Sequence, residues 1–174
     1  AVFMLCFALL SGYRLFETGL LYFAIHLLRD IVAAGLFLKR TKAKHSDGSI
    51  MSAAVAYIST LFSLVYMAPI GAVSPTMQLV FNGLSIVGFA IATLAVIELG
   101  DRFGITPAKR GERCKSGIYT YLRHPMYTGY VIAEMGWVLI NPLNAPFFIL
   151  SLTLYAARVR LEERVLSGGD TRRG

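Results

Sequence analysis

The chain has 174 residues, of which 56% are hydrophobic and only 16% are charged, and its formal net charge at pH 7 is +7. Soluble domains are typically about 45–50% apolar and about 25% charged. A water-exposed surface would be hard to cover with so few charged side chains, so the composition favours a membrane protein. Cys6 and Cys114 have neither disulfide nor metal-ligand spacing, and we predict no metal site.

Apolar runs separated by short polar stretches predict several membrane-spanning helices, each of which needs roughly 17–25 mostly apolar residues. Residues 2–11 form a short run, typical of a truncated first span, and 12–18 are predicted to be a loop. The other runs are 19–38, 50–70, 76–99, 125–140 and 147–159, and the longest polar stretch is 100–124. We expect an all-α integral membrane bundle of five or six transmembrane helices, forming one domain over 1–174.

Two further expectations concern the ends of the chain. The last two apolar runs are short for independent spans, so we expect a helical hairpin that folds back at Asn141 and Pro142 and brings 100–124 beside 158–166. The chain begins at Ala1 inside an apolar run, so we expect a missing or processed N-terminus.

The uneven distribution of Lys and Arg predicts an orientation. Of the 17 basic residues, 15 fall in 39–44, 100–124 and 158–173, whereas Arg14 is assigned to the opposite side and Arg29 to a span. Because cytoplasmic loops are enriched in Lys and Arg, we expect the 100–124 loop and the C-terminal helix to face the cytoplasm. Basic residues confined to connecting stretches argue against a nucleic-acid-binding face.

Three polar residues fall in the middle of the predicted second span. His26, Arg29 and Asp30 are spaced i, i+3, i+4 and share one helical face. A charge at mid-bilayer costs about 2.5–3.5 kcal/mol, so we expect them to pair with each other or with another helix. Both a structural polar seam and the wall of an internal cavity fit this pattern. Glu134, inside the fifth run, is expected to face the bundle interior, without an assigned role.

The densest run of chemical groups is Gly-Ile-Tyr-Thr-Tyr-Leu-Arg-His-Pro-Met-Tyr-Thr-Gly, residues 117–129. Pro125 predicts a helix start. Arg123 and His124 then precede a helix N-terminus, where free N–H groups favour anions, and the Arg fork suits a carboxylate or phosphate. An interfacial anchor of aromatic and basic residues is an equally good interpretation.

A second polar element lies on the last predicted helix. Arg158 and Glu162 are four residues apart and share a face, and Glu163 follows directly. Taken alone, this element is typical of an ordinary basic membrane flank with weak helix ion pairs.

Together, the two elements resemble the isoprenylcysteine carboxyl methyltransferase family and related membrane methyltransferases, which include phospholipid N-methyltransferases. The resemblance lies in Gly117-Ile118-Tyr119, in Arg123-His124-Pro125-Met126-Tyr127, and in Arg158 with Glu162-Glu163, and it covers roughly 98–166. It implies a pocket for S-adenosyl-L-methionine at the cytoplasmic face and a tunnel open to lipid for the acceptor.

The resemblance also implies roles for single residues. The implied cofactor contacts are Arg113, Cys114, Gly117, Tyr119, His124, Pro125, Met126, Tyr127, Glu162 and Glu163. Arg158 resembles the anchor of an acceptor carboxylate, and Arg123 and His124 are the other candidate catalytic residues. The family's His-x-Leu-Val stretch falls on Gly-Glu-Arg-Cys, 111–114. The family's Tyr-rich segment after the Glu pair is missing, so we expect either a truncated chain or a more open pocket.

The predicted function is therefore an S-adenosylmethionine-dependent methyltransferase that acts on a lipophilic acceptor from the bilayer. A prenylcysteine carboxylate, a phospholipid amine, a thiol and a quinone-like lipid all remain open as acceptors, and no protein partner can be deduced. The alternatives are an NADPH-dependent membrane enzyme of the sterol-reductase type and a non-catalytic relative. The prediction requires His124 and Glu162 to face one shared hollow.

Overall fold

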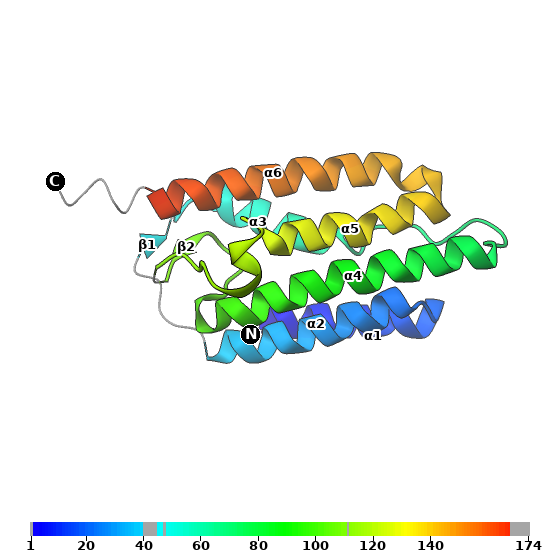
Figure 1. Ribbon diagram of the computed structural model, residues 1–174, viewed down its shortest axis with the longest axis horizontal. Helices are drawn as coiled ribbons and strands as arrows, with labels where there is room; N and C mark the ends of the chain where they lie inside the picture. Colours follow the sequence, from blue (N-terminus) through cyan, green and yellow to red (C-terminus); the bar gives the residue numbers. More distant parts are fainter. Residues whose placement is uncertain (1, 40–44, 47, 111, 168–174) are drawn as a thin grey trace.

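The computed structural model describes residues 2–39, 45–46, 48–110 and 112–167, which form an all-α bundle (Figure 1). Its main helices are α1 (Val2–Thr18), α2 (Leu21–Leu38), α3 (Ile50–Phe62), α4 (Pro75–Leu99), α5 (Pro125–Ile140) and α6 (Ala145–Ser167). The short 3-10 helices are η1 (Gly100–Arg102), η2 (Gly117–Thr120) and η3 (Pro142–Asn144). Two-residue strands β1 (His45–Ser46) and β2 (Ala108–Lys109) pair antiparallel.

The helices run back and forth along the bundle, so its two ends differ in character (Figure 1). One end, which we call the polar end, gathers the loop between α4 and α5, the strand pair and the C-terminal part of α6. The other end holds the segment between α3 and α4 together with η3. The basic stretches 100–124 and 158–167 thus meet at the same end, as the predicted hairpin requires.

The predicted hairpin between α5 and α6 is confirmed, and asparagine side chains fix its turn. The Asn141 side-chain oxygen accepts a hydrogen bond from the Leu143 amide at 3.1 Å, and its amide donates to the Ala68 carbonyl at 2.9 Å. The Asn144 amide donates to the Met67 carbonyl at 3.0 Å. These bonds also hold the segment after α3, which has no helical ladder of its own.

Helices α4 and α5 lie in very close contact. A Cβ atom built on Gly88 would lie 2.4 Å from the carbonyl oxygen of Gly129, and one on Gly129 would lie 2.4 Å from the carbonyl oxygen of Gly88. Only residues without a side chain permit such an approach of two backbones. The glycine at the end of the 117–129 run therefore presses the first turns of α5 against α4.

An aromatic cluster fills the interior toward the other end of the bundle. Trp137 is fully buried, and its ring lies 4.9 Å from Tyr22 and 5.2 Å from Phe81, both in edge-to-face geometry. Tyr66 stacks on Trp137 at 5.9 Å. Such pairs contribute about 0.5–1.5 kcal/mol beyond area burial, so this cluster ties α2, α4 and α5 to the segment after α3.

Two predicted boundaries are wrong. Residues 12–18 were expected to be a loop, but α1 continues to Thr18, because Arg14 finds partners there: its guanidinium donates to the Tyr66 carbonyl at 2.9 Å and lies over the Phe23 ring. The span expected over 50–70 ends as a helix at Phe62. Pro69 disfavours helix in the residue before it, and the carbonyls of Met67 and Ala68 bond to the asparagine side chains instead.

The other predicted spans correspond to helices. The run 19–38 forms α2, 76–99 forms α4, 125–140 forms α5, and 147–159 lies within the longer α6. One helical stretch in the described part of the chain, Pro75–Arg102, is long and apolar enough to cross a bilayer, with a mean hydropathy of 2.2. The basic stretch 40–44 lies outside the described residues.

Candidate functional site

A cavity of about 140 Å³, which we call the outer cavity, opens at the polar end of the bundle. Its walls come from the loop after α4, from η2 and the start of α5, and from the last turns of α6. The predicted site residues that line it are Arg113, Cys114, Tyr119, Arg123, His124, Met126, Tyr127 and Glu162. His124 and Glu162 thus face one hollow, although they are far apart in the chain.

The start of α5 builds one wall as the Arg-His-Pro run predicts. Pro125 is the first residue of α5, and His124 directly precedes it. The proline nitrogen has no hydrogen to leave unpaired, so the helix begins there at no cost. Pro125 itself is buried and does not line the cavity, whereas the flanking His124 and Met126 do.

Tyr127 joins this wall to α6. Its hydroxyl donates a short hydrogen bond to the Glu162 carboxylate. The Arg158 guanidinium carbon lies 5.2 Å from the centre of the Tyr127 ring, and Arg158 Nη2 lies 4.0 Å from Glu162 Oε1. The predicted shared face of Arg158 and Glu162 is thus present, and Glu162 brings negative charge to a cavity wall that is otherwise rich in arginine.

Glu163 performs a different task from its neighbour, because its carboxylate gathers three cationic or polar side chains. Arg113 donates to both of its oxygens, at 2.8 and 3.3 Å, in a two-pronged geometry that suits Arg and carboxylate. His124 Nε2 lies 2.9 Å and Arg123 Nε 3.4 Å from Oε1. Hydrogen bonds from Arg113 hold the pKa of the Glu163 carboxyl below its ordinary value. Glu163 therefore ties the cavity walls to α6 and does not itself line the cavity.

Gly117 also acts behind the cavity wall. Its φ of +54° is in the left-handed region, and a Cβ there would lie 1.8 Å from Glu98 Oε1. The Glu98 carboxylate accepts the Ile118 amide N–H at 3.0 and 2.9 Å. Glycine is thus required for both conformation and space, and it lets Glu98 on α4 hold η2 in place. Sequence reasoning missed this role of Glu98, since nothing in the spacing links it to Gly117.

Arg158 lies deeper than the other predicted residues. Its side chain is 3% exposed, and its guanidinium donates to Ser59 Oγ at 3.2 Å, Thr60 Oγ1 at 3.1 Å and the Ile105 carbonyl at 2.8 Å. It lines a second, smaller hollow of about 20 Å³, which we call the inner cavity. Met126 lines both cavities, so they are direct neighbours.

Arg123 lies at the edge of the site. The Arg123 side chain is 72% exposed, so it belongs to the rim of the outer cavity. Gly111, the first residue of the stretch where the expected family sequence is replaced, lies outside the described residues. Of the rest of that stretch, Glu112, Arg113 and Cys114 line the outer cavity.

The sequence that builds this site matches a known protein family. The family model "Phospholipid methyltransferase" matches residues 70–168. The chain belongs to the phospholipid methyltransferase family. The matched part contains α4, α5 and α6 and all the predicted site residues, whereas α1, α2 and α3 lie before it. The resemblance inferred from the two polar elements is thereby confirmed.

A curated relative agrees with this family membership. The chain is 32% identical over 90 residues to Protein-S-isoprenylcysteine O-methyltransferase of Saccharomyces cerevisiae. The aligned part is 48% of this chain and 38% of that protein, so the match spans well under half the length of the relative. No solved structure matches the chain.

Proposed function

We propose that this protein is an integral membrane methyltransferase that uses S-adenosyl-L-methionine to methylate a lipophilic acceptor arriving from the bilayer. The observation that carries the proposal is the outer cavity, where His124, Tyr127 and Glu162 converge within the family-matched region. The family match does not favour the nicotinamide-dependent alternative.

The lining of the outer cavity fits the groups of this cofactor, which has a sulfonium, ribose hydroxyls and an amino-acid end. The carboxylates of Glu162 and Glu112 suit cationic and hydroxyl groups, whereas Arg102 and Arg113 suit a carboxylate. Met126 and Tyr119 add less polar surface. When bound, the cofactor supplies an activated methyl group on a positively charged sulfur.

The chain's own residues mainly have to align donor and acceptor and exclude water. Tyr127 and Arg158 hold Glu162 at the wall of the outer cavity. The bond between Arg113 and Glu163 fixes the loop after α4 to α6 beside the same cavity. Methylation of a carboxylate is an in-line displacement and needs no general base. An amine or thiol acceptor would need a proton acceptor, and His124 is the lining residue suited to that step.

Arg158 favours an anionic acceptor over an amine. It is a buried cation whose hydrogen bonds go to neutral oxygens, and it stands next to the outer cavity. The yeast relative is named for action on protein S-isoprenylcysteine, which fits a prenylcysteine carboxylate as the acceptor here. The family's description favours a phospholipid amine as the second candidate acceptor.

We further propose that the helices form a multi-pass bundle with the polar end in the cytoplasm. Large apolar side chains face outward on several helices, among them Leu9, Phe16 and Leu79, which are 74%, 90% and 72% exposed. A belt of this kind suits contact with lipid tails. The basic residues near the outer cavity suit the cytoplasmic side.

Isothermal titration of the detergent-solubilised protein with S-adenosylhomocysteine tests cofactor binding. We expect saturable heat, and a loss of roughly tenfold or more in affinity for Glu162→Gln, because a hydrogen-bonded charged group is lost. Glu17→Gln, exposed at the opposite end, is the matched control and should bind like the unaltered protein. Absence of heat from folded protein would overturn the proposal, and saturable binding of NADPH in its place would point to the reductase alternative.

A further inference from the structure

The inner cavity lies in the bundle interior and brings together two arginines from distant parts of the chain. Arg29 comes from α2 and Arg158 from α6, with Thr60 of α3 beside them. Its other walls are mostly apolar, including Val96, Phe103 and Tyr130. A volume of about 20 Å³ admits one group of about the size of a water molecule. Two guanidinium groups around so small a hollow require explanation, because burying charge is costly.

Arg158 brings a positive charge that its surroundings do not neutralise by hydrogen bonding. Its described hydrogen-bond partners are two hydroxyls and a backbone carbonyl, all neutral. The carboxylate of Glu162, 4.0 Å away, receives the Tyr127 hydroxyl and faces the outer cavity. In the described part of the chain, the buried Nε of Arg158 has no hydrogen-bond partner. Both the charge and this N–H would be satisfied by an anionic oxygen.

Arg29 is held rigidly and carries its own counter-charge. Its Nε donates to Asp30 Oδ1 at 3.0 Å, and its guanidinium lies over the rings of Tyr130 and Phe89, at 5.1 and 5.6 Å. Ser11 donates to Asp30 Oδ2 at 2.9 Å. Arg29 and Asp30 together are neutral, so Arg29 contributes hydrogen-bond donors to the cavity without adding net charge.

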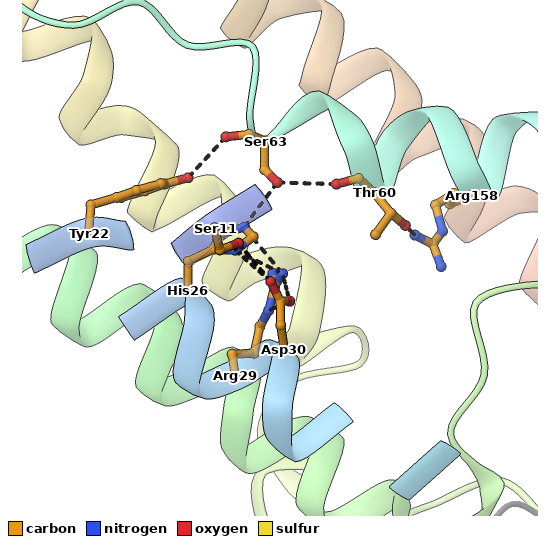
Figure 2. A network of polar contacts seen from close by, with 8 residues as sticks. All are labelled: Ser11, Tyr22, His26, Arg29, Asp30, Thr60, Ser63 and Arg158. Atoms are coloured by element: carbon orange, nitrogen blue, oxygen red, sulfur yellow. Dashed lines mark hydrogen bonds and ion pairs between the residues drawn. The ribbon is translucent and has the colours of Figure 1, made fainter. Parts of the chain in front are cut away.

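One polar network supports both arginines, as Figure 2 shows. His26 Nδ1 lies 3.0 Å from Asp30 Oδ2, and His26 Nε2 lies 3.1 Å from Ser63 Oγ. Ser63 Oγ in turn donates to the Thr60 carbonyl at 3.1 Å, and the Thr60 hydroxyl accepts from Arg158. The buried polar residues of α2 therefore form a continuous frame that reaches the cation beside the outer cavity.

We propose that Arg29 and Arg158 together form a binding site for a single negatively charged oxygen group on the acceptor, with Arg29 as a specificity-determining residue. The inference rests on the proposed function and extends it, because it places part of the acceptor site in α2, before the family-matched region. Arg29, Asp30 and Arg158 together carry one positive charge, and the Glu162 carboxylate lies 4.0 Å from Arg158, so a carboxylate fits the site better than a dianionic phosphate. Met126, which lines both cavities, puts this group next to the methyl donor's cavity.

The test uses N-acetyl-S-farnesylcysteine and its uncharged carboxamide as probes, titrated by calorimetry into detergent-solubilised protein saturated with S-adenosylhomocysteine. We expect the unaltered protein to bind the acid roughly tenfold or more tightly than the amide, since the amide lacks the charge. This comparison needs no variant, so it tests the recognition of an anionic group even where a substitution prevents folding. Equal affinities for acid and amide, which would mean that the inner cavity holds a structural water only, would overturn it.

The double variant Arg29→Gln/Asp30→Asn locates the site, because it removes both charges and leaves no unpaired buried carboxylate. We expect it to reduce the preference for the acid several-fold, because the Arg29 donors are lost while the Arg158 charge remains, and to bind S-adenosylhomocysteine like the unaltered protein. Arg14→Gln, a partly buried arginine near the other end of α1, is the matched control and should change neither affinity. A folded double variant that keeps the full preference for the acid refutes the role of Arg29. Failure of the unaltered protein to bind S-adenosylhomocysteine would instead refute the proposed function.

Discussion

The ion pairs of Glu163 in the family-matched region, which contains α4 to α6, are partly exposed, whereas those of Asp30 in the preceding region, which contains α1 to α3, are buried. In the first region, Arg113 and Glu163 form a partly exposed ion pair beside the outer cavity, and Glu163 belongs to a compact motif of the sequence. In the second, His26 and Asp30 are fully buried, and their partners come from three separate segments. In the proposed acceptor site, residues from the motif-bearing surface and from the motif-free interior act together.

Arg158 stands where the two regions meet, so its replacement should give the largest effect. Arg158→Gln removes the donors to Ser59 in α3 and to the Ile105 carbonyl. We expect the kcat/KM for N-acetyl-S-farnesylcysteine to fall by roughly a hundredfold or more, measured by transfer of a radiolabelled methyl group. Arg158→Lys should recover only part of this loss, since lysine lacks the planar fork.

The exposed Arg160→Gln, on the same helix, is the control for Arg158 and should retain normal rates. Comparable activity of Arg158→Gln and Arg160→Gln would mean that Arg158 does not act in catalysis or acceptor binding. This outcome would contradict a site shared by α1–α3 and α4–α6.

Gly117→Ala, within the family-matched region, should have an intermediate effect on stability. An alanine there would need a positive φ and would collide with Glu98, so we expect about 1–3 kcal/mol of destabilisation or local displacement of η2. Thermal unfolding followed by circular dichroism, together with S-adenosylhomocysteine titration, measures both.

Gly83→Ala is the matched control for Gly117→Ala, because Gly83 lies within α4 and an added Cβ meets no atom within 4 Å. It should be neutral or stabilising by up to about 1 kcal/mol. Equal stabilities of the two variants would mean that the Glu98–Gly117 contact does not hold the loop.

Glu163 gives the smallest expected effect and a dependence on pH. Its pKa is lowered in the folded protein by Arg113, so its stabilising contribution is complete above the ordinary value of 4.5 and is lost as pH falls through the lower folded value. Because the cluster is partly exposed, we expect Glu163→Gln to lower the melting temperature by only about 2–4 °C at pH 7.

The difference in melting temperature between the Glu163→Gln variant and the unaltered protein should persist from pH 7 to about 5 and shrink below about 4.5. Glu17→Gln should show no such pattern. A melting temperature of Glu163→Gln equal to that of the unaltered protein at pH 7 would mean that the cluster does not support the cavity wall.

Local signals in the sequence were enough for part of this structure. Pro125 marks the start of α5, and Asn141 with Pro142 marks the hairpin, because prolines and turn residues restrict the backbone wherever they occur. The end of α3 was missed although Pro69 follows it, because the apolar run continued across the break. Arg14 suggested a loop, because its hydrogen-bond partner, the Tyr66 carbonyl, is distant in the sequence and could not be foreseen.

The site shows the same division. The shared face of Arg158 and Glu162 follows from helical spacing, and the spacing of His26, Arg29 and Asp30 correctly indicated one polar face. Glu162 and Glu163 point in different directions because Glu162 bonds to Tyr127 and Glu163 bonds to Arg113. Neither partner can be read from the spacing of the two glutamates. The joining of Arg29 and Arg158 around one hollow depends on how α2 packs on α4 and how α6 packs on α3 and α5, and the spacing within α2 or α6 does not reveal this.

The contact between Gly88 and Gly129 has a consequence for turnover. With no side chains between them at that point, α4 and α5 form a stiff unit that cannot easily slide or spread. If the proposed function holds, the widening that releases the used cofactor should come from the opposite side, where the partly solvated ion pairs of Glu163 join α6 to the loop. Because such pairs weaken in salt, product exit should be faster at high ionic strength.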